Sequence, residues 1–310
     1  MGMNSLISTH IMIHSFFNNT QTQKDGMIFN NLNWTTRNWH IKYLLILMIF
    51  ILLCTKQSSA FSIIKPEIAD QILTRLFTQS HIPKISYQLK ATYPLDNHLF
   101  MQGMFFDSNN KELTISSGLF KTSKIVRTNL LGKVLKERHI PEKFFGESIT
   151  YDHGMLYQLT YQSGQVFVYD FENLNIEHTY QIPGEGWGIT TLNHHFYISD
   201  GSEKIQVRTG SDFKLKKNIS VHAGNIPIKG INDLTTMESI IVANIFPSSI
   251  IILLSPDDGQ IKGWFDVSQF KESCSPDAMC VTNGLHYNPS DKTLFISGKR
   301  WSKIYQLKLL

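Results

Sequence analysis

The sequence predicts an all-β protein, a five-bladed β-propeller closed by an N-terminal strand that joins the last blade. The main observation is a short polar-then-apolar signature that recurs five times and begins at Gln102, Glu147, Trp187, Asn232 and Asn283. Successive signatures lie roughly 40 to 50 residues apart, the length of a four-stranded blade. Apolar segments punctuated by turn residues follow each signature, and no stretch sustains a helical period long enough for a βαβ unit.

Residues 1–60 are predicted to be a leader outside the fold. An apolar run at residues 43–54 is shorter than the ~20 residues that span a bilayer, and the small residues Ser58, Ser59 and Ala60 follow it. This pattern is typical of a signal peptide, and we expect cleavage after Ala60. An uncleaved anchor is the alternative. Cleavage would give an exported protein, periplasmic, secreted or in the secretory pathway, with no stable membrane span.

Two further parts follow the leader. Residues 61–84 are a lead-in, either a short helix or irregular, because Pro66 precedes an apolar spacing at Ile68, Ile72 and Phe77. Residues 85–310 form the propeller domain. The last signature is followed by only three obvious strands, and residues 85–93 precede the first signature without a blade of their own. We therefore expect residues 85–93 to add as the outer strand of the last blade and cover its open edge.

Charge and ligand spacing narrow the functional classes. The formal net charge is +4 and the basic residues are scattered, which gives nucleic-acid binding little support. The 12 histidines show no metal-ligand spacing. Cys274 and Cys280 could form a disulfide in an exported protein, whereas a metal site would need further ligands, and only His286 is near. We expect a monomer with no metal.

The five leading residues should converge on one small volume, because a propeller places the start of each first strand beside its axis. The motifs that contain them are Phe100-Met101-Gln102-Gly103-Met104, Phe145-Gly146-Glu147, Glu185-Gly186-Trp187-Gly188, Ile231-Asn232-Asp233-Leu234 and Thr282-Asn283-Gly284-Leu285. Two further motifs are Ser116-Ser117-Gly118-Leu119-Phe120 and Ser297-Gly298-Lys299-Arg300-Trp301. Taken in chain order, over about residues 87–310, these motifs resemble the plant and bacterial type of glutaminyl-peptide cyclotransferase (glutamine cyclotransferase). The resemblance implies a propeller enzyme that converts the N-terminal glutamine of peptides to pyroglutamate, releases ammonia, and uses no cofactor.

The resemblance also implies roles for individual residues. Gln102, Asn232 and Lys299 would form hydrogen bonds to the substrate or to the reaction intermediate. Phe100, together with Tyr161 and Phe246 in place of two family tryptophans, would supply aromatic walls.

Two leading residues leave alternatives open. Trp187 either contacts substrate or packs between blades. Glu147 either orients structure near the axis or takes part in proton transfer as a partial replacement for the family's base.

One position departs from the family pattern. The resemblance implies a catalytic glutamate three residues before Gly118, where this chain has Ile115. Glu112 cannot replace it, because an odd offset along a strand points to the opposite face. Three hypotheses therefore stay open: an active cyclotransferase, a weak or silent relative that binds peptide N-termini, and a structural propeller.

Overall fold

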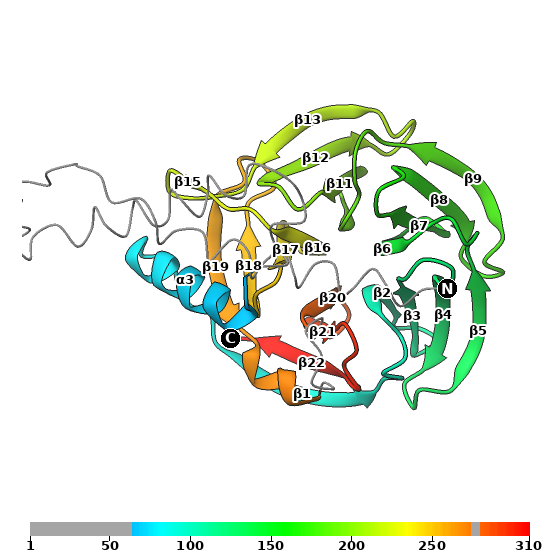
Figure 1. Cartoon of the computed structure of the whole chain (residues 1–310), viewed down its shortest axis with the longest axis horizontal. Helices are drawn as coiled ribbons and strands as arrows, with labels where there is room; N and C mark the ends of the chain where they lie inside the picture. The colour runs from blue at the N-terminus through cyan, green and yellow to red at the C-terminus, as the bar shows by residue number, and fades with distance from the viewer. Residues whose placement is uncertain (1–63, 274–279) are drawn as a thin grey trace, which may run out of the picture. The chain divides into compact units, whose positions relative to one another are not determined.

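The computed structural model describes residues 64–273 and 280–310. Five four-stranded antiparallel sheets surround one axis, which confirms the predicted five-bladed propeller (Figure 1). The predicted leader at residues 1–60 and its cleavage site lie outside the described residues. In the part of the chain that is described, no helix combines the length and apolar character needed to cross a bilayer.

Each blade runs from an inner strand at the axis to an outer strand at the rim. Blade 1 comprises β2 (Met101–Asp107), β3 (Glu112–Ser117), β4 (Lys124–Asn129) and β5 (Val134–His139). Blade 2 comprises β6 (Gly146–Asp152), β7 (Met155–Thr160), β8 (Gln165–Asp170) and β9 (Ile176–Gln181). Blade 3 comprises β10 (Ile189–Leu192), β11 (His195–Ser199), β12 (Lys204–Thr209) and β13 (Leu215–Ser220). Blade 4 comprises β16 (Ile231–Met237), β17 (Ile240–Ile245), β18 (Ile250–Leu254) and β19 (Ile261–Asp266). Blade 5 comprises β20 (Thr282–Asn288), β21 (Thr293–Gly298), β22 (Lys303–Leu309) and β1 (Tyr87–Pro94).

Blade 5 is built from both ends of the propeller domain. Strand β1 pairs antiparallel with β22, from Tyr87 opposite Leu309 to Pro94 opposite Lys303. The strand begins and ends slightly later than residues 85–93, the segment that the sequence suggested for this place. Inner and middle strands are largely buried, because neighbouring blades pack against each other, and outer strands such as β5 are exposed. The outer strand β19 of blade 4 is an exception and is mostly buried.

A helix and three short elements lie outside the blades. Helix α3 (Pro66–Gln79) occupies the lead-in, and its Phe77 packs against Trp264 of blade 4 at a centroid distance of 5.8 Å. Asp70 of the helix forms an ion pair with Lys271 at 3.2 Å. The remaining elements are β14 (His222–Ala223), β15 (Ile226–Pro227) and the 3-10 helix η3 (Ser268–Ser273).

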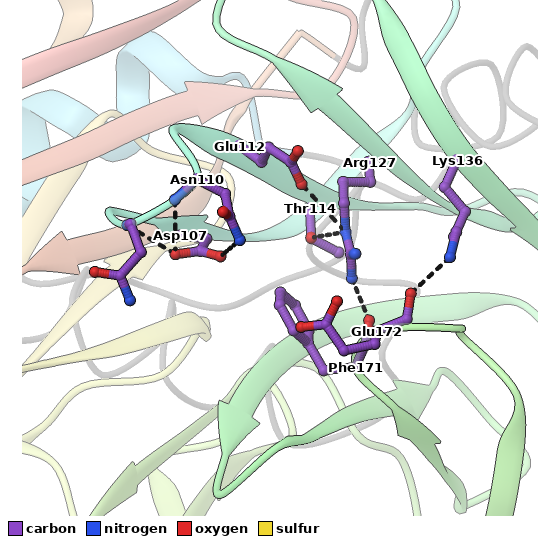
Figure 2. Close-up of polar contacts among 9 residues, drawn as sticks. Asp107, Asn110, Glu112, Thr114, Arg127, Lys136, Phe171 and Glu172 are labelled. Atoms are coloured by element: carbon purple, nitrogen blue, oxygen red, sulfur yellow. Dashed lines mark hydrogen bonds and ion pairs between the residues drawn. The ribbon is translucent and has the colours of Figure 1, made fainter.

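Polar contacts near the rim hold blade 1 against blade 2 (Figure 2). The buried guanidinium of Arg127 lies 4.2 Å from the centroid of the Phe171 ring and donates a hydrogen bond to the Phe171 carbonyl. Glu112 lies 4.0 Å from Arg127, and Lys136 donates to the Glu172 carbonyl at 2.6 Å. Cationic side chains therefore satisfy carbonyl groups at the turn of the next blade, where the sheets themselves offer no donor.

Close packing at the axis generates a stability prediction at Gly188. A Cβ at this position would lie 2.0 Å from the Asn232 carbonyl oxygen and 2.8 Å from the Asp233 Cα, both backbone atoms of the next blade. Gly188→Ala should therefore lower the free energy of unfolding by roughly 2 kcal/mol or more, measured by urea denaturation.

Gly186→Ala is the matched control for this substitution. Its added Cβ would meet only side-chain carbons of Ile182 and Leu159, at 3.2 Å, which can shift. The control should cost under about 1 kcal/mol. Equal losses in the two variants would contradict the close approach of blades 3 and 4.

Candidate active site on the propeller axis

Four of the five leading residues meet on the axis through their side chains. Asn232 donates from Nδ2 to Asn283 Oδ1 at 3.3 Å, and Asn283 donates from Nδ2 to Gln102 Oε1 at 2.6 Å. Gln102 in turn donates from Nε2 to Glu147 Oε1 at 3.4 Å. All four residues are buried and come from four different blades. The expected convergence of Gln102, Glu147, Asn232 and Asn283 is therefore present, as a chain of amides that ends on a carboxylate.

The backbone of Glu147 is held in place by blades 1 and 2. Ser116 donates from its hydroxyl to the Glu147 carbonyl, and Gln158 donates from Nε2 to Ser116 Oγ at 2.8 Å. Tyr169 donates from its hydroxyl to Gln158 Oε1 at 2.8 Å. These buried contacts fix where the Glu147 side chain leaves the strand, and therefore where its carboxylate lies.

A second buried carboxylate, Asp233, was not singled out from the sequence. It accepts hydrogen bonds from the Ser148 hydroxyl and from the Leu285 amide, the latter at 2.7 Å, and its own amide donates to Asn244 Oδ1 at 2.9 Å. It thereby joins blades 2, 4 and 5. A signal was present: the second signature position is glycine or serine in the other four blades, and only blade 4 has a charge there.

Aromatic side chains form a girdle, defined here as Phe100, Phe145, Tyr161, Trp187 and Phe246. Neighbouring rings along this series lie 6.4, 5.9, 6.4 and 5.9 Å apart between centroids. Lys299 completes the circle, with Nζ 5.5 Å from the Phe246 centroid and 5.2 Å from the Phe100 centroid. The structure therefore brings the four predicted aromatic residues and Lys299 together. Sequence reasoning missed Phe145, although it lies two residues before Glu147, as Phe100 lies two before Gln102.

Burial dominates the electrostatics of this site. The pKa of Glu147 is raised to about 8, mainly by desolvation; the charge of Lys299 opposes this shift, whereas Asp233 and Glu185 contribute to it. Desolvation likewise lowers the pKa of Lys299, against the opposing effect of Glu147 and Asp233. The pKa of Asp233 is raised to about 7 by burial, despite its hydrogen bonds. Glu147 and Asp233 are thus poised to change protonation near neutral pH.

Ile115 does not belong to this site. Its side chain is fully buried in an apolar cluster with Met104, Val126, Phe295 and Ile304, between blades 1 and 5. The next residue, Ser116, faces blade 2 and holds Glu147. The placement of a catalytic carboxylate at position 115 therefore disagrees with the geometry, whereas the Glu147 carboxylate accepts a hydrogen bond from Gln102 on the axis.

The remaining site predictions concern cysteines and metals. Cys280 is disulfide-bonded, whereas Cys274 lies outside the described residues, so the pairing of these two cysteines stays a prediction. Among the residues that the structure describes, no three His, Cys, Asp or Glu side chains cluster in a way that could hold a metal ion.

Together these features define a five-bladed propeller with a buried acid–base site on its axis, enclosed by aromatic rings and one lysine. The family model for glutamine cyclotransferase matches residues 61–309, and the chain belongs to that family. It is 27% identical over 227 residues to a glutaminyl-peptide cyclotransferase of Arabidopsis thaliana, a match that covers 72% of this chain and 71% of the relative. The crystal structure of Myxococcus xanthus glutaminyl cyclase shares the fold, with a TM-score of 0.69 and 24% identity over 74% of this chain and 98% of that one.

The raised pKa of Glu147 generates a prediction about stability and pH. Between its ordinary value of 4.5 and about 8, the folded protein retains a proton on Glu147 that the unfolded chain has lost. This group therefore makes the free energy of unfolding fall as pH rises through that window. Glu147→Gln removes the effect, so the stability of the variant relative to the wild type should rise from pH 5 to pH 8. The gain should be at most about 1.4 kcal/mol per pH unit, the slope for one proton.

Chemical denaturation at several pH values measures this difference. Glu142→Gln is the control, because the Glu142 side chain is exposed and its charge is screened by solvent. A relative stability of Glu147→Gln that stays constant over this range would show that the Glu147 carboxylate is already ionised at pH 5.

Proposed function

We propose that this protein is an active glutaminyl-peptide cyclotransferase and that Glu147 moves the proton in its reaction. The proposal is supported above all by one observation: the axis carries a buried carboxylate whose pKa is raised to about 8, close to the ~7.7–8.0 of a peptide α-amine. Family membership supplies the reaction class, and the geometry supplies the groups that the reaction requires.

The reaction needs one proton to be moved between two nitrogen atoms. The α-amine nitrogen of the N-terminal glutamine forms a bond to the side-chain carboxamide carbon, and the bond from that carbon to the amide nitrogen then breaks. Glu147, as the carboxylate, accepts a proton from the attacking nitrogen and returns it to the departing nitrogen, which leaves as ammonia. The hydrogen bond from Gln102 keeps one Glu147 oxygen in place during both transfers.

The other axial groups suit the remaining tasks. The intermediate carries an oxyanion, which the Lys299 ammonium beside the Phe100 ring could stabilise, with Asn232 as a second donor. The aromatic girdle would surround the neutral substrate side chain and exclude water, which strengthens these electrostatic contacts. Trp187 and Phe246 meet edge to face, and therefore form one side of this enclosure.

The activity test is release of ammonia from a short peptide that begins with glutamine, catalysed by the purified protein. Wild type should be active, and Glu147→Gln should lower kcat by roughly 10²–10⁴, the contribution of a positioned general acid–base group. Exposed Glu142→Gln should match wild type. Binding of the peptide without turnover in wild type would instead favour the silent relative that binds peptide N-termini.

Ile115→Glu separates the two candidate positions for the carboxylate. Because Ile115 is fully buried among apolar side chains, a glutamate there should destabilise the fold and leave kcat no higher than in wild type. Ile115→Val, which keeps the site apolar, should retain normal turnover. A gain in kcat for Ile115→Glu would overturn the assignment of proton transfer to Glu147.

We further propose that the protein is exported and acts on peptides or proteins outside the cytosol. The support comes from the sequence: an apolar run at residues 43–54, the small residues before position 61, and the cysteine pair Cys274 and Cys280. Mass spectrometry of the protein recovered from an oxidising compartment should find an N-terminus at Phe61 and a peptide crosslinked through Cys274 and Cys280. A retained leader, or two free thiols, would contradict this proposal.

A further inference from the structure

A second site lies on the same axis, beyond the acid–base site. A cavity of about 380 Å³ is lined by residues from the inner strands of all five blades. Its lining begins two or three residues after the signature positions, as at Met104 after Gln102 and Thr190 after Trp187. At about 3.3 Å per residue, the lining lies roughly 7 Å or more from the leading residues. None of the residues assigned above to catalysis or to the girdle contributes to it.

Several residues that line the cavity carry hydroxyl groups. Thr190 and Thr236 share a hydrogen bond at 3.0 Å, and Thr235 accepts one from the Tyr287 amide at 3.0 Å. Thr150 and Thr191 also line the cavity and are partly exposed, and within residues 64–273 and 280–310 their hydroxyls have no hydrogen-bond partner. These two hydroxyls are therefore free to bind a ligand.

Other lining residues are aromatic. Phe105 stacks on Tyr151 at 4.8 Å and meets the His286 ring edge to face at 5.0 Å, and these residues come from blades 1, 2 and 5. Desolvation lowers the pKa of the His286 ring to about 4, so it is neutral at pH 7. A small cavity lined by both aromatic rings and hydroxyl groups suits a ligand with both C–H and O–H groups.

The cavity contains almost no charge, in contrast to the acid–base site. No lysine or arginine lines it, and Glu238 is its one lining carboxylate. Glu238 is exposed and lies 4.0 Å from Lys292, so solvent and a counter-charge weaken its field. A charged ligand would lose hydration without gaining a partner, which favours a neutral one.

We propose that this cavity binds a neutral polyhydroxylated ring of about the size of a single hexose sugar. Its C–H groups would pack against Tyr151 and His286, and its hydroxyls would exchange hydrogen bonds with Thr150 and Thr191. The volume lies within the roughly 300–1,000 Å³ of small-molecule sites. The proposal does not depend on the cyclotransferase reaction, because the two sites share no residue.

Saturation-transfer NMR on the full-length protein tests the proposal, with N-acetylglucosamine and methyl glucoside as neutral probes and glucuronate as the charged one. At least one neutral sugar should bind. Glucuronate should bind at least tenfold more weakly, because its carboxylate would lie in the cavity without a counter-charge and near Glu238. Failure of both neutral sugars to bind at tens of millimolar would overturn the proposal, as would tighter binding of glucuronate. This comparison requires no variant.

A double variant locates the binding. Thr150→Val with Thr191→Val removes both free hydroxyls with little change of shape, and should weaken sugar binding about tenfold or more. Thr179→Val, on exposed strand β9, is the matched control and should bind as wild type does. Glu147→Gln should also leave sugar binding unchanged. Equal affinity in wild type and in a folded double variant would place the sugar elsewhere and overturn the proposal.

Discussion

Burial of the Glu147 carboxylate is the constraint on which the rest of this structure depends. A carboxylate removed from water is stable only if it is protonated, paired or hydrogen-bonded. Here Gln102 donates to it, Lys299 supplies an opposing charge, and Ser116 holds its backbone from the neighbouring blade. Gln102 and Ser116 come from blade 1, and Lys299 follows strand β21 of blade 5. The propeller fold brings them to one point, because blades 1 and 5 meet blade 2 around the axis.

Asp233 shows that the same axis also serves stability. Its hydrogen bonds to Ser148 and Leu285 join three blades, in addition to the polar contact between Asn232 and Asn283. Loss of one partner would leave a buried charge or donor unsatisfied, which costs more than a typical surface contact. Because Asp233 also raises the pKa of Glu147, the group that joins the blades influences the group proposed to move the proton. Structural and chemical roles are therefore coupled at this site.

The sequence predicted the fold well because propeller blades repeat, and a repeat of about 45 residues with turn chemistry leaves few alternatives. It also predicted the convergence of Gln102, Asn232 and Asn283, since position in a blade determines distance from the axis. It failed at Ile115, where a count along one motif could not show that this side chain faces blade 5 while Ser116 faces blade 2. Phe145 and Asp233 were missed because their partners are far apart in sequence and only the packing of blades brings them together.

The two ends of the inner strands carry different kinds of side chain, ionisable and amide groups at one end and neutral hydroxyl and aromatic groups at the other. The leading positions carry the carboxylate, the amides and the tryptophan, whereas positions two to four residues further on carry threonine, phenylalanine and a neutral histidine. Some residues of the second site also pack between blades, as Ile149 and Leu285 do where they are buried against neighbouring sheets. The inner strands therefore supply residues to the core and to the axis at once. The ends of one set of five strands can then hold two sites whose ligands differ in charge.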